Sequence, residues 1–324
     1  MLNILARLCA FRPFRLATAS LALLLLAGCG TPQRLNIPVW EEAPLPEAVE
    51  IPYGQGRIWQ VDFPGQEPSY LFGTIHVSDP RVFNLPKAAE EAFAKAHIAA
   101  FEAANDDNPE DSVVKTYFEL PKDTDLEEVI GSETYDRMMG LFLFQVLKFE
   151  RLDRMQPWVI WMLVGGQEIT VDVRQQKDKP VLDDWLQTRA ADDGKEVVAL
   201  ETAIQQWSIF SDMPMEDQVS MLRSAIDHYN GPRTKVERIR LYLDGDLAVR
   251  QALWDRFLSS MDPAVAQRFN ERLVTGRNRS MTERLAALFA RGSTFVAVGA
   301  MHLPGAEGIL SLLERRGYTV TRLQ

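Results

Sequence analysis

Two copies of one pattern, a short apolar run followed by Gly-x-x-His, constrain this chain most. The first copy covers residues 70–76 (YLFGTIH) and the second covers residues 295–302 (FVAVGAMH). Apolar runs of this length predict buried strands, so each His is expected at the carboxyl end of a strand. Open α/β sheets place their ligands beyond these ends. Because imidazole is a common metal ligand and a ready acid or base, His76 and His302 are the first candidates for function.

Each pattern belongs to a predicted strand–helix–strand unit. The elements are expected at 70–77, 85–96 and 98–102 in the first unit, and at 295–298, 307–316 and 318–323 in the second. Such βαβ units join one sheet with parallel strands. The sequence therefore predicts an α/β fold with a central mixed, largely parallel sheet built from two βαβ-type units.

Between the two units, from about residue 110 to residue 290, most of the chain predicts a large helical insert. Helices are expected at 134–154, 157–164, 181–193, 216–229, 233–244, 247–258, 263–273 and 281–290. Ser280 and Glu283 have the spacing of a capping box at the start of the last helix. Arg277 and Asn278 precede this box. They form a loop and cap, or Arg277 reaches the rim of the sheet to bind an oxyanion or a substrate carboxylate.

The first 28 residues have the features of a secretory signal rather than of the fold. A segment with three arginines precedes a short apolar run, and small residues follow it. Residues 26–29 (LAGC) resemble a bacterial lipobox, which implies cleavage before Cys29 and lipidation of its thiol. Ordinary signal cleavage with a free Cys29 is the alternative. Gly30, in place of Asp, favours the outer membrane, so we expect a lipid-anchored protein of the cell envelope that faces the periplasm.

The segment 29–56 is rich in Pro and Glu and is expected to be an extended tether, with the folded domain at 57–324. Loss of the signal removes three Arg and no acid, which takes the formal net charge from −10 to −13. Because a protein with this negative charge repels phosphate backbones, we do not expect nucleic acid as a partner. The expected partners are the membrane, through Cys29, and a peptide or small-molecule substrate.

Two further apolar runs end in carboxylates, at Glu102 and Glu201. Because the ends of parallel strands meet at one rim, these groups are expected beside His76 and His302. Two imidazoles and two carboxylates suit Zn²⁺, Mn²⁺ or Co²⁺, with one carboxylate left as a general base. The alternative is that each His is structural and each Glu is merely the solvated end of a strand. We expect both imidazoles to face one cleft that Glu102 borders.

These residues resemble the TraB/GumN family, which is related to the Tiki metalloproteases and to the erythromycin-esterase/ChaN-like superfamily. The resemblance runs from about residue 59 to residue 324. Its landmarks are residues 70–77, 101–102, 157–158, 200–202, 277–281 and 298–305. The chain departs from the family pattern before Asp183, where the family tends to have a Gly near Val181 or Leu182.

The resemblance implies a mixed α/β core and a metal-dependent, hydrolase-like site. It places His76, Glu102 and His302 on the metal. Arg277 and Asn278 match an Arg-Asn motif, and Glu201 matches a Leu-Glu-Thr motif. The resemblance therefore makes Glu201, Arg277 and Asn278 the expected catalytic residues.

The leading hypothesis is a periplasm-facing lipoprotein with a divalent-metal-dependent, peptidase-like hydrolase site. Glu201 would be a base or a fourth ligand, and Arg277 would orient the substrate. The first alternative is an envelope lipoprotein that binds haem or a metal without turnover. The helical insert could supply an apolar wall for haem, although core packing accounts for the same side chains: Met138, Met139, Phe142, Phe144, Trp158 and Trp161. The second alternative is a structural lipoprotein whose ancestral site is inactive.

Overall fold

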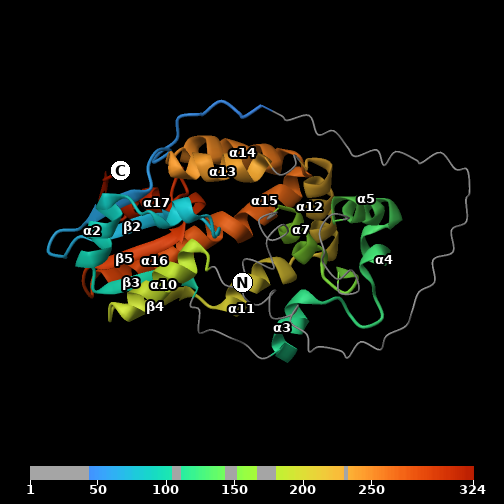
Figure 1. The fold of residues 1–324 in the computed structure, drawn as a ribbon, viewed down its shortest axis with the longest axis horizontal. Helices are drawn as coiled ribbons and strands as arrows, with labels where there is room; N and C mark the ends of the chain where they lie inside the picture. Colours follow the sequence, from blue (N-terminus) through green and yellow to red (C-terminus); the bar gives the residue numbers. More distant parts are fainter. Residues whose placement is uncertain (1–43, 104–110, 143–151, 166–179, 230–232) are drawn as a thin grey trace, which may run out of the picture. The chain divides into compact units, whose positions relative to one another are not determined.

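A six-stranded sheet in the order β4-β3-β5-β2-β1-β6 forms the centre of the fold (Figure 1). The computed structural model describes residues 44–103, 111–142, 152–165, 180–229 and 233–324. The strands are β1 Ile58–Asp62, β2 Ser69–Thr74, β3 Ile98–Ala103, β4 Glu196–Glu201, β5 Thr294–Gly299 and β6 Thr319–Arg322. Strands β4, β3, β5 and β2 pair in parallel, whereas β1 runs antiparallel to both β2 and β6. The expected mixed, largely parallel α/β sheet is confirmed.

The two βαβ units are interleaved in this sheet. Strand β5, from the C-terminal unit, lies between β2 and β3 of the first unit. The register places Thr74 of β2 opposite Gly299 of β5, so the two Gly-x-x-His segments leave the sheet side by side. The sequence indicated that these strands share one sheet, and the structure shows that they are direct neighbours.

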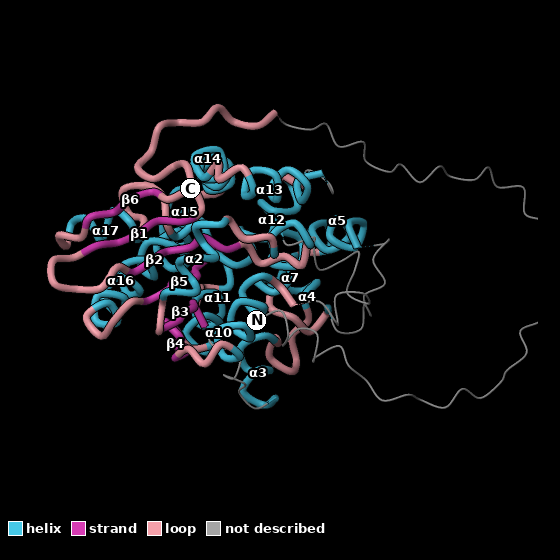
Figure 2. Tube along the Cα trace, turned by 60° about the vertical axis from the view of Figure 1, so that its left-hand side comes forward, coloured by secondary structure: helices cyan, strands magenta, loops and turns pink. Residues whose placement is uncertain are grey.

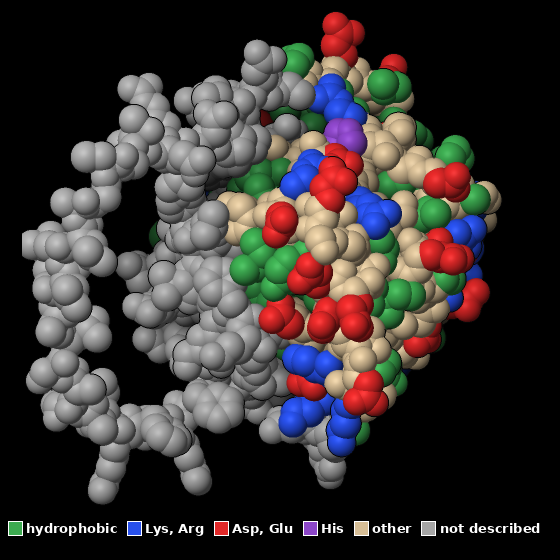
Figure 3. Space-filling view, turned by 90° about the vertical axis from the view of Figure 1, so that its right-hand side faces the viewer, with side chains coloured by type: hydrophobic (Ala, Val, Ile, Leu, Met, Phe, Trp, Pro, Cys, Tyr) green, Lys and Arg blue, Asp and Glu red, His purple; other side chains and the backbone are tan. Residues whose placement is uncertain are grey.

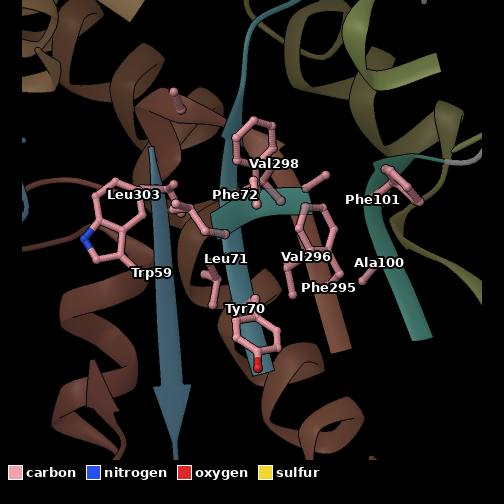
Figure 4. Packing of buried hydrophobic residues seen from close by; sticks show 14 of the residues in the cluster. Trp59, Tyr70, Leu71, Phe72, Ala100, Phe101, Phe295, Val296, Val298 and Leu303 are labelled. Atoms are coloured by element: carbon pink, nitrogen blue, oxygen red, sulfur yellow. The ribbon is translucent and has the colours of Figure 1, made fainter. Parts of the chain in front are cut away.

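The central strands are apolar because both faces of the sheet are covered. All six residues of β2 are buried, and five of the six in β5 are. Phe72 and Phe295 lie on these neighbouring strands with ring centroids 5.9 Å apart, and Trp59 of β1 and Leu303 extend the same core (Figure 4). Parallel strands buried on both sides have this composition, and for this reason the apolar runs were visible in the sequence.

Four helices pack against the sheet: α2 Lys87–Lys95, α10 Leu182–Asp192, α16 Gly276–Phe289 and α17 Ile309–Arg315. Helices α2 and α10 are joined by Arg189, whose guanidinium lies 4.6 Å from the centroid of the Phe93 ring and donates to Glu90. Helix α16 contacts both α17 and β4. This contact brings the first turn of α16 to the carboxyl ends of the strands.

The predicted helical insert is present (Figures 1 and 2), and aromatic contacts join its helices. Its helices are α3 Asp111–Phe118, α4 Leu126–Ile130, α5 Ser132–Phe142, α7 Pro157–Gly165, α11 Ala203–Ser211, α12 Met215–Asp227, α13 Arg233–Leu243, α14 Leu247–Ser259 and α15 Pro263–Asn270. Trp158 stacks on Phe210 with centroids 5.1 Å apart, and the Trp161 ring meets Phe269 edge to face. Across the described ranges, no helix has the length and apolarity needed to cross a membrane.

One predicted helix boundary is wrong. Helix α16 begins at Gly276 and continues directly from a π-helical turn, η2 Glu271–Thr275, so Ser280 lies inside the helix rather than at its cap. The capping-box pattern was misleading because its residues also fit a helix interior. Arg277 and Asn278 therefore belong to the first turn of a helix and not to a loop.

Part of the segment that the sequence assigned to the tether is packed on the domain. The backbone N–H of Gly305 donates to Pro52 O at 2.7 Å, and that of Gly56 donates to Gly245 O at 2.9 Å. The packed chain therefore begins before Arg57. The signal segment, Cys29 and residues 30–43 of the tether lie outside the described residues, as do residues 143–151 of the helix expected at 134–154.

Candidate functional site

Four predicted side chains meet at the carboxyl edge of the sheet. His76 follows β2, Glu102 lies in β3, Glu201 ends β4, and His302 ends a 3₁₀ turn, η3 Ala300–His302, directly after β5. Glu102 Oε1 accepts a hydrogen bond from Gly299 N at 2.6 Å and lies 3.6 Å from His302 Nε2. The expectation that these groups share one rim is confirmed.

Gly299 marks the centre of this arrangement, because its missing side chain leaves the space that the other groups face. A Cβ atom at this position would lie 3.0 Å from Glu102 Oε1, 3.6 Å from His302 Cδ2 and 3.8 Å from His76 Nε2. The two imidazoles therefore face one space from two sides, as the sequence predicted. The other glycine of the pair has a different role, since a Cβ on Gly73 would lie 3.0 Å from the Cα of Ala300 in η3.

His302 is held in one orientation by Asn278. Asn278 Nδ2 donates to the backbone oxygen of Glu307 at 2.8 Å, which turns Asn278 Oδ1 toward the ring. His302 Nδ1 lies 2.6 Å from this oxygen and must therefore carry the ring proton, which leaves the Nε2 lone pair free to accept. Burial lowers the pKa of His302 to about 4, with Glu102 opposing and Arg277 adding to this effect. His302 is thus a neutral imidazole at neutral pH.

His76 has a carboxylate partner instead. Its Nδ1 lies 2.9 Å from Asp183 Oδ2, and the other oxygen of Asp183 accepts from Thr74 Oγ1 at 2.6 Å. The Asp183 charge raises the pKa of His76 to about 9. The His76 side chain is 53% exposed, whereas that of His302 is 10% exposed. His76 therefore lies on the solvent side of the site and His302 on its buried side.

Arg277 connects the other groups. Its Nε donates to both oxygens of Glu201 at 3.0 Å, and its Nη2 donates to Glu201 Oε2 at 2.7 Å and to Glu102 Oε2 at 2.8 Å. Its Nη1 lies 3.1 Å from His302 Nε2. Burial alone would raise the pKa of Glu102, but Arg277 and the two imidazoles hold it well below its usual range. Glu102 is therefore ionised and paired.

The donor set matches the chemistry of a divalent metal site. His302 is held through Nδ1 by Asn278 Oδ1, and His76 Nδ1 lies 2.9 Å from Asp183 Oδ2, as the second ring nitrogen of a metal-bound histidine usually lies beside an oxygen. His76 Nε2 and Cδ2 of the His302 ring border the space at Gly299. The ionised Glu102 is an oxygen ligand, and its 3.6 Å separation from His302 Nε2 suits two ligands of one ion. Within the described ranges, however, no three His, Cys, Asp or Glu side chains converge as ligands of one ion. Arg277 lies among the donors instead.

Sequence reasoning missed Asp183. Its carboxylate follows no strand, because it lies in the first turn of α10, and its partners Thr74 and His76 come from a distant part of the chain. The sequence comparison with the family pointed only to the glycine that this chain lacks near Val181 or Leu182, and not to Asp183 itself. Asn278 was expected to be catalytic, and the structure places it behind His302, where it orients the ring. Glu201 was expected to be a base or ligand, and both of its oxygens accept from Arg277.

Two of the side chains proposed as a wall for haem lie in the core of the helical insert. Met138 and Trp158 are fully buried, and Trp158 is stacked on Phe210. Packing therefore accounts for these two side chains, and Phe144 lies outside the described residues.

Figure 3 shows one face of the molecule, on which acidic, basic and hydrophobic side chains are interspersed over the described part.

Comparison with known proteins places the chain in a family. The sequence model of the TraB/PrgY/gumN family matches residues 57–322, which is most of the chain. The chain belongs to this family. Its curated relatives include a metalloprotease TIKI homolog of Amphimedon queenslandica (23% identical), metalloprotease TIKI1 of Danio rerio (25%) and metalloprotease TIKI1 of Homo sapiens (26%).

These alignments cover 82%, 78% and 78% of this chain, respectively, but only 61%, 60% and 59% of the relatives. The chain thus spans about three fifths of the length of the curated relatives it matches. No solved structure gave a significant match. The family resemblance inferred from the motifs is confirmed, and its coarse implication is a metal-dependent, hydrolase-like family.

Proposed function

We propose that this chain is a divalent-metal-dependent hydrolase that acts on a peptide or a related amide or ester bond. The observation that carries the proposal is the placement of His76, Glu102 and His302 around the space at Gly299, with each imidazole oriented through Nδ1. The relatives named as metalloproteases support the same chemistry. When bound, a divalent ion such as Mn²⁺, Co²⁺ or Zn²⁺ polarises a carbonyl and lowers the pKa of its water.

The other residues have positioning roles in this proposal. Asp183 and Asn278 occupy Nδ1 of the two imidazoles, which leaves Nε2 of each ring as the nitrogen for a metal. Glu201 holds the Arg277 guanidinium with both carboxylate oxygens, which leaves Arg277 at the wall of the cleft. An arginine at that place can bind a substrate carboxylate or a developing oxyanion.

The test is metal binding by the purified protein, followed by peptide cleavage. Metal content after gentle purification, and titration with Mn²⁺, Co²⁺ and Zn²⁺, are compared for the wild type, His76→Ala and His302→Ala. His228→Ala is the matched control, since His228 follows α12 and its ring Nδ1 lies 2.9 Å from the backbone oxygen of Ser224, away from the proposed ligands in the chain. Loss of binding in the first two variants alone supports the proposal. If the wild-type protein binds none of the three ions, the proposal is contradicted.

We also propose that the protein is lipidated at Cys29 and anchored in the cell envelope, facing the periplasm. This rests on residues 26–29 (LAGC) and on the apolar signal segment before them. One acyl chain gives marginal membrane binding, whereas several acyl chains on one residue give a stable anchor. Labelled fatty acid should enter the wild type and not Cys29→Ser, and the variant should leave the membrane fraction. Fatty-acid labelling that persists in Cys29→Ser would contradict the anchor.

A further inference from the structure

Arg277 contacts two of the three proposed metal ligands, His302 and Glu102. His302 Nδ1 is bonded to Asn278, so Nε2 is the one ring nitrogen left to bind a metal, and it lies 3.1 Å from Arg277 Nη1. Glu102 Oε2 accepts from Arg277 Nη2 at 2.8 Å. The guanidinium thus contacts lone pairs of two of the three proposed ligands, His302 and Glu102.

A metal ion and this guanidinium cannot hold His302 at the same time. A metal lies about 2.0 to 2.2 Å from a ligating imidazole nitrogen, along the lone pair that Arg277 Nη1 now meets. The two cations would also repel each other across a site with little solvent, since the side chains of Arg277, Glu102 and His302 are each 10% exposed. Binding of the metal therefore requires the guanidinium to give up His302.

Arg277 has a place to remain after it leaves His302. Glu201 accepts from its Nε and Nη2, and the backbone oxygen of Leu273 accepts from its Nη1 at 3.1 Å. Neither acceptor belongs to the three proposed metal ligands. A small rotation of the guanidinium could break the contacts with His302 and Glu102 while these others persist.

We propose that Arg277 is a built-in counter-cation of the site, which occupies His302 and Glu102 in the metal-free protein and is displaced toward Glu201 when a divalent ion binds. This inference rests on the proposed metal site and deepens it. Arg277 then lowers the apparent metal affinity, because each binding event must first break its contacts. In the metal-free protein, the positive charge of Arg277 compensates the buried carboxylates of Glu102 and Glu201.

The experiment measures Co²⁺ affinity by calorimetry and by the visible absorption of the bound ion. Arg277→Ala is expected to bind Co²⁺ about tenfold more tightly than the wild type, or tighter still, within the range usual for coupled sites. Arg279→Ala is the matched control, since it removes an exposed arginine from the same helix and should leave the affinity unchanged. Millimolar guanidinium ion should refill the space left in Arg277→Ala and weaken Co²⁺ binding there, but not in the wild type.

The outcomes separate this inference from the proposed function. If the wild type binds Co²⁺ through His302 and Arg277→Ala binds it equally or more weakly, the competition is wrong and the metal site stands. If neither protein binds Co²⁺, both proposals fall. Should Arg277→Ala fail to fold, Arg277→Lys replaces it: a single ammonium group reaches fewer acceptors, so tighter binding than wild type supports the inference and equal or weaker binding overturns it.

Discussion

At the scale of single residues, the two glycines of the Gly-x-x-His patterns have different roles. Gly299 leaves open the space between Glu102, His76 and His302, whereas Gly73 allows η3 to approach the sheet. A side chain at Gly299 meets mainly side chains, which can move by a few tenths of an ångström. A side chain at Gly73 meets the Cα and Cβ of Ala300, which cannot. The same substitution should therefore damage function at one site and folding at the other.

Gly299→Ala is expected to keep the fold and lose divalent-metal binding by at least about tenfold, because its methyl group fills the site. Gly73→Ala is expected to destabilise the protein by roughly 1–3 kcal/mol through overpacking. Urea unfolding and Co²⁺ titration of both variants check this pair. Unchanged Co²⁺ affinity in a folded Gly299→Ala protein would show that the space at Gly299 is not the metal position.

The raised pKa of His76 gives a second prediction at this scale. Asp183 favours the protonated ring, so this contact stabilises the metal-free fold below the ordinary pKa of 6.5, and the contribution is lost as the pH rises through about 9. Asp183→Asn should return the pKa of His76 toward 6.5, as measured by NMR titration, and should flatten the dependence of unfolding free energy on pH in this window. Asp192→Asn, at the far end of the same helix, serves as the control.

At the scale of elements, the π-helical turn η2 determines where Arg277 points. Gly276 ends this turn, and its N–H donates to Glu271 O. A Cβ on Gly276 would lie 2.7 Å from the same backbone oxygen, so only glycine fits this junction as built. Such single π turns interrupt helices mostly where function requires it. Here the turn brings Arg277 and Asn278 to the strand ends.

Gly276→Ala should therefore destabilise the protein by roughly 1–3 kcal/mol and loosen the contacts of Arg277. Gly140→Ala is the matched control: Gly140 lies in α5 with open space around it, so alanine there should stabilise by about 0.5–1 kcal/mol through its helix propensity. Urea unfolding of the two variants should give shifts of opposite sign. Equal shifts would mean that the turn adapts to a side chain at residue 276.

The elements that could be predicted from sequence are those whose signal is local. The strands ending at Gly299 and Glu201 are short apolar runs, and the insert shows helical periodicity, so these were found. The order of the strands was not predicted, because it depends on pairing between distant segments. For the same reason the contacts of Asp183 with His76 and of Asn278 with His302 were missed. The start of α16 was misplaced because a π turn has no capping signature.

At the scale of the whole molecule, the fold should not depend on the metal. Residues from both ends of the chain share one large apolar core around the sheet, and Arg277 compensates Glu102 and Glu201. Chelated protein is expected to keep its secondary structure and cooperative unfolding. Added Co²⁺ should raise the unfolding free energy by about 2.7 kcal/mol at a hundredfold excess over its Kd. Loss of structure on chelation, seen by circular dichroism, would contradict this.

The central place of β5 has a consequence for how the protein is made. Strands β2 and β3 have no direct pairing with each other in the sheet, and the strand that joins them is synthesised about 190 residues after β3. In a nascent chain, the apolar strands β2 and β3 stay without their shared partner until residues 294–299 have been synthesised. Completion of the sheet therefore depends on non-local pairing, which is typically slow. His302 directly follows β5, so the rim that brings His76, Glu102 and His302 together can form only after β5 has joined the sheet.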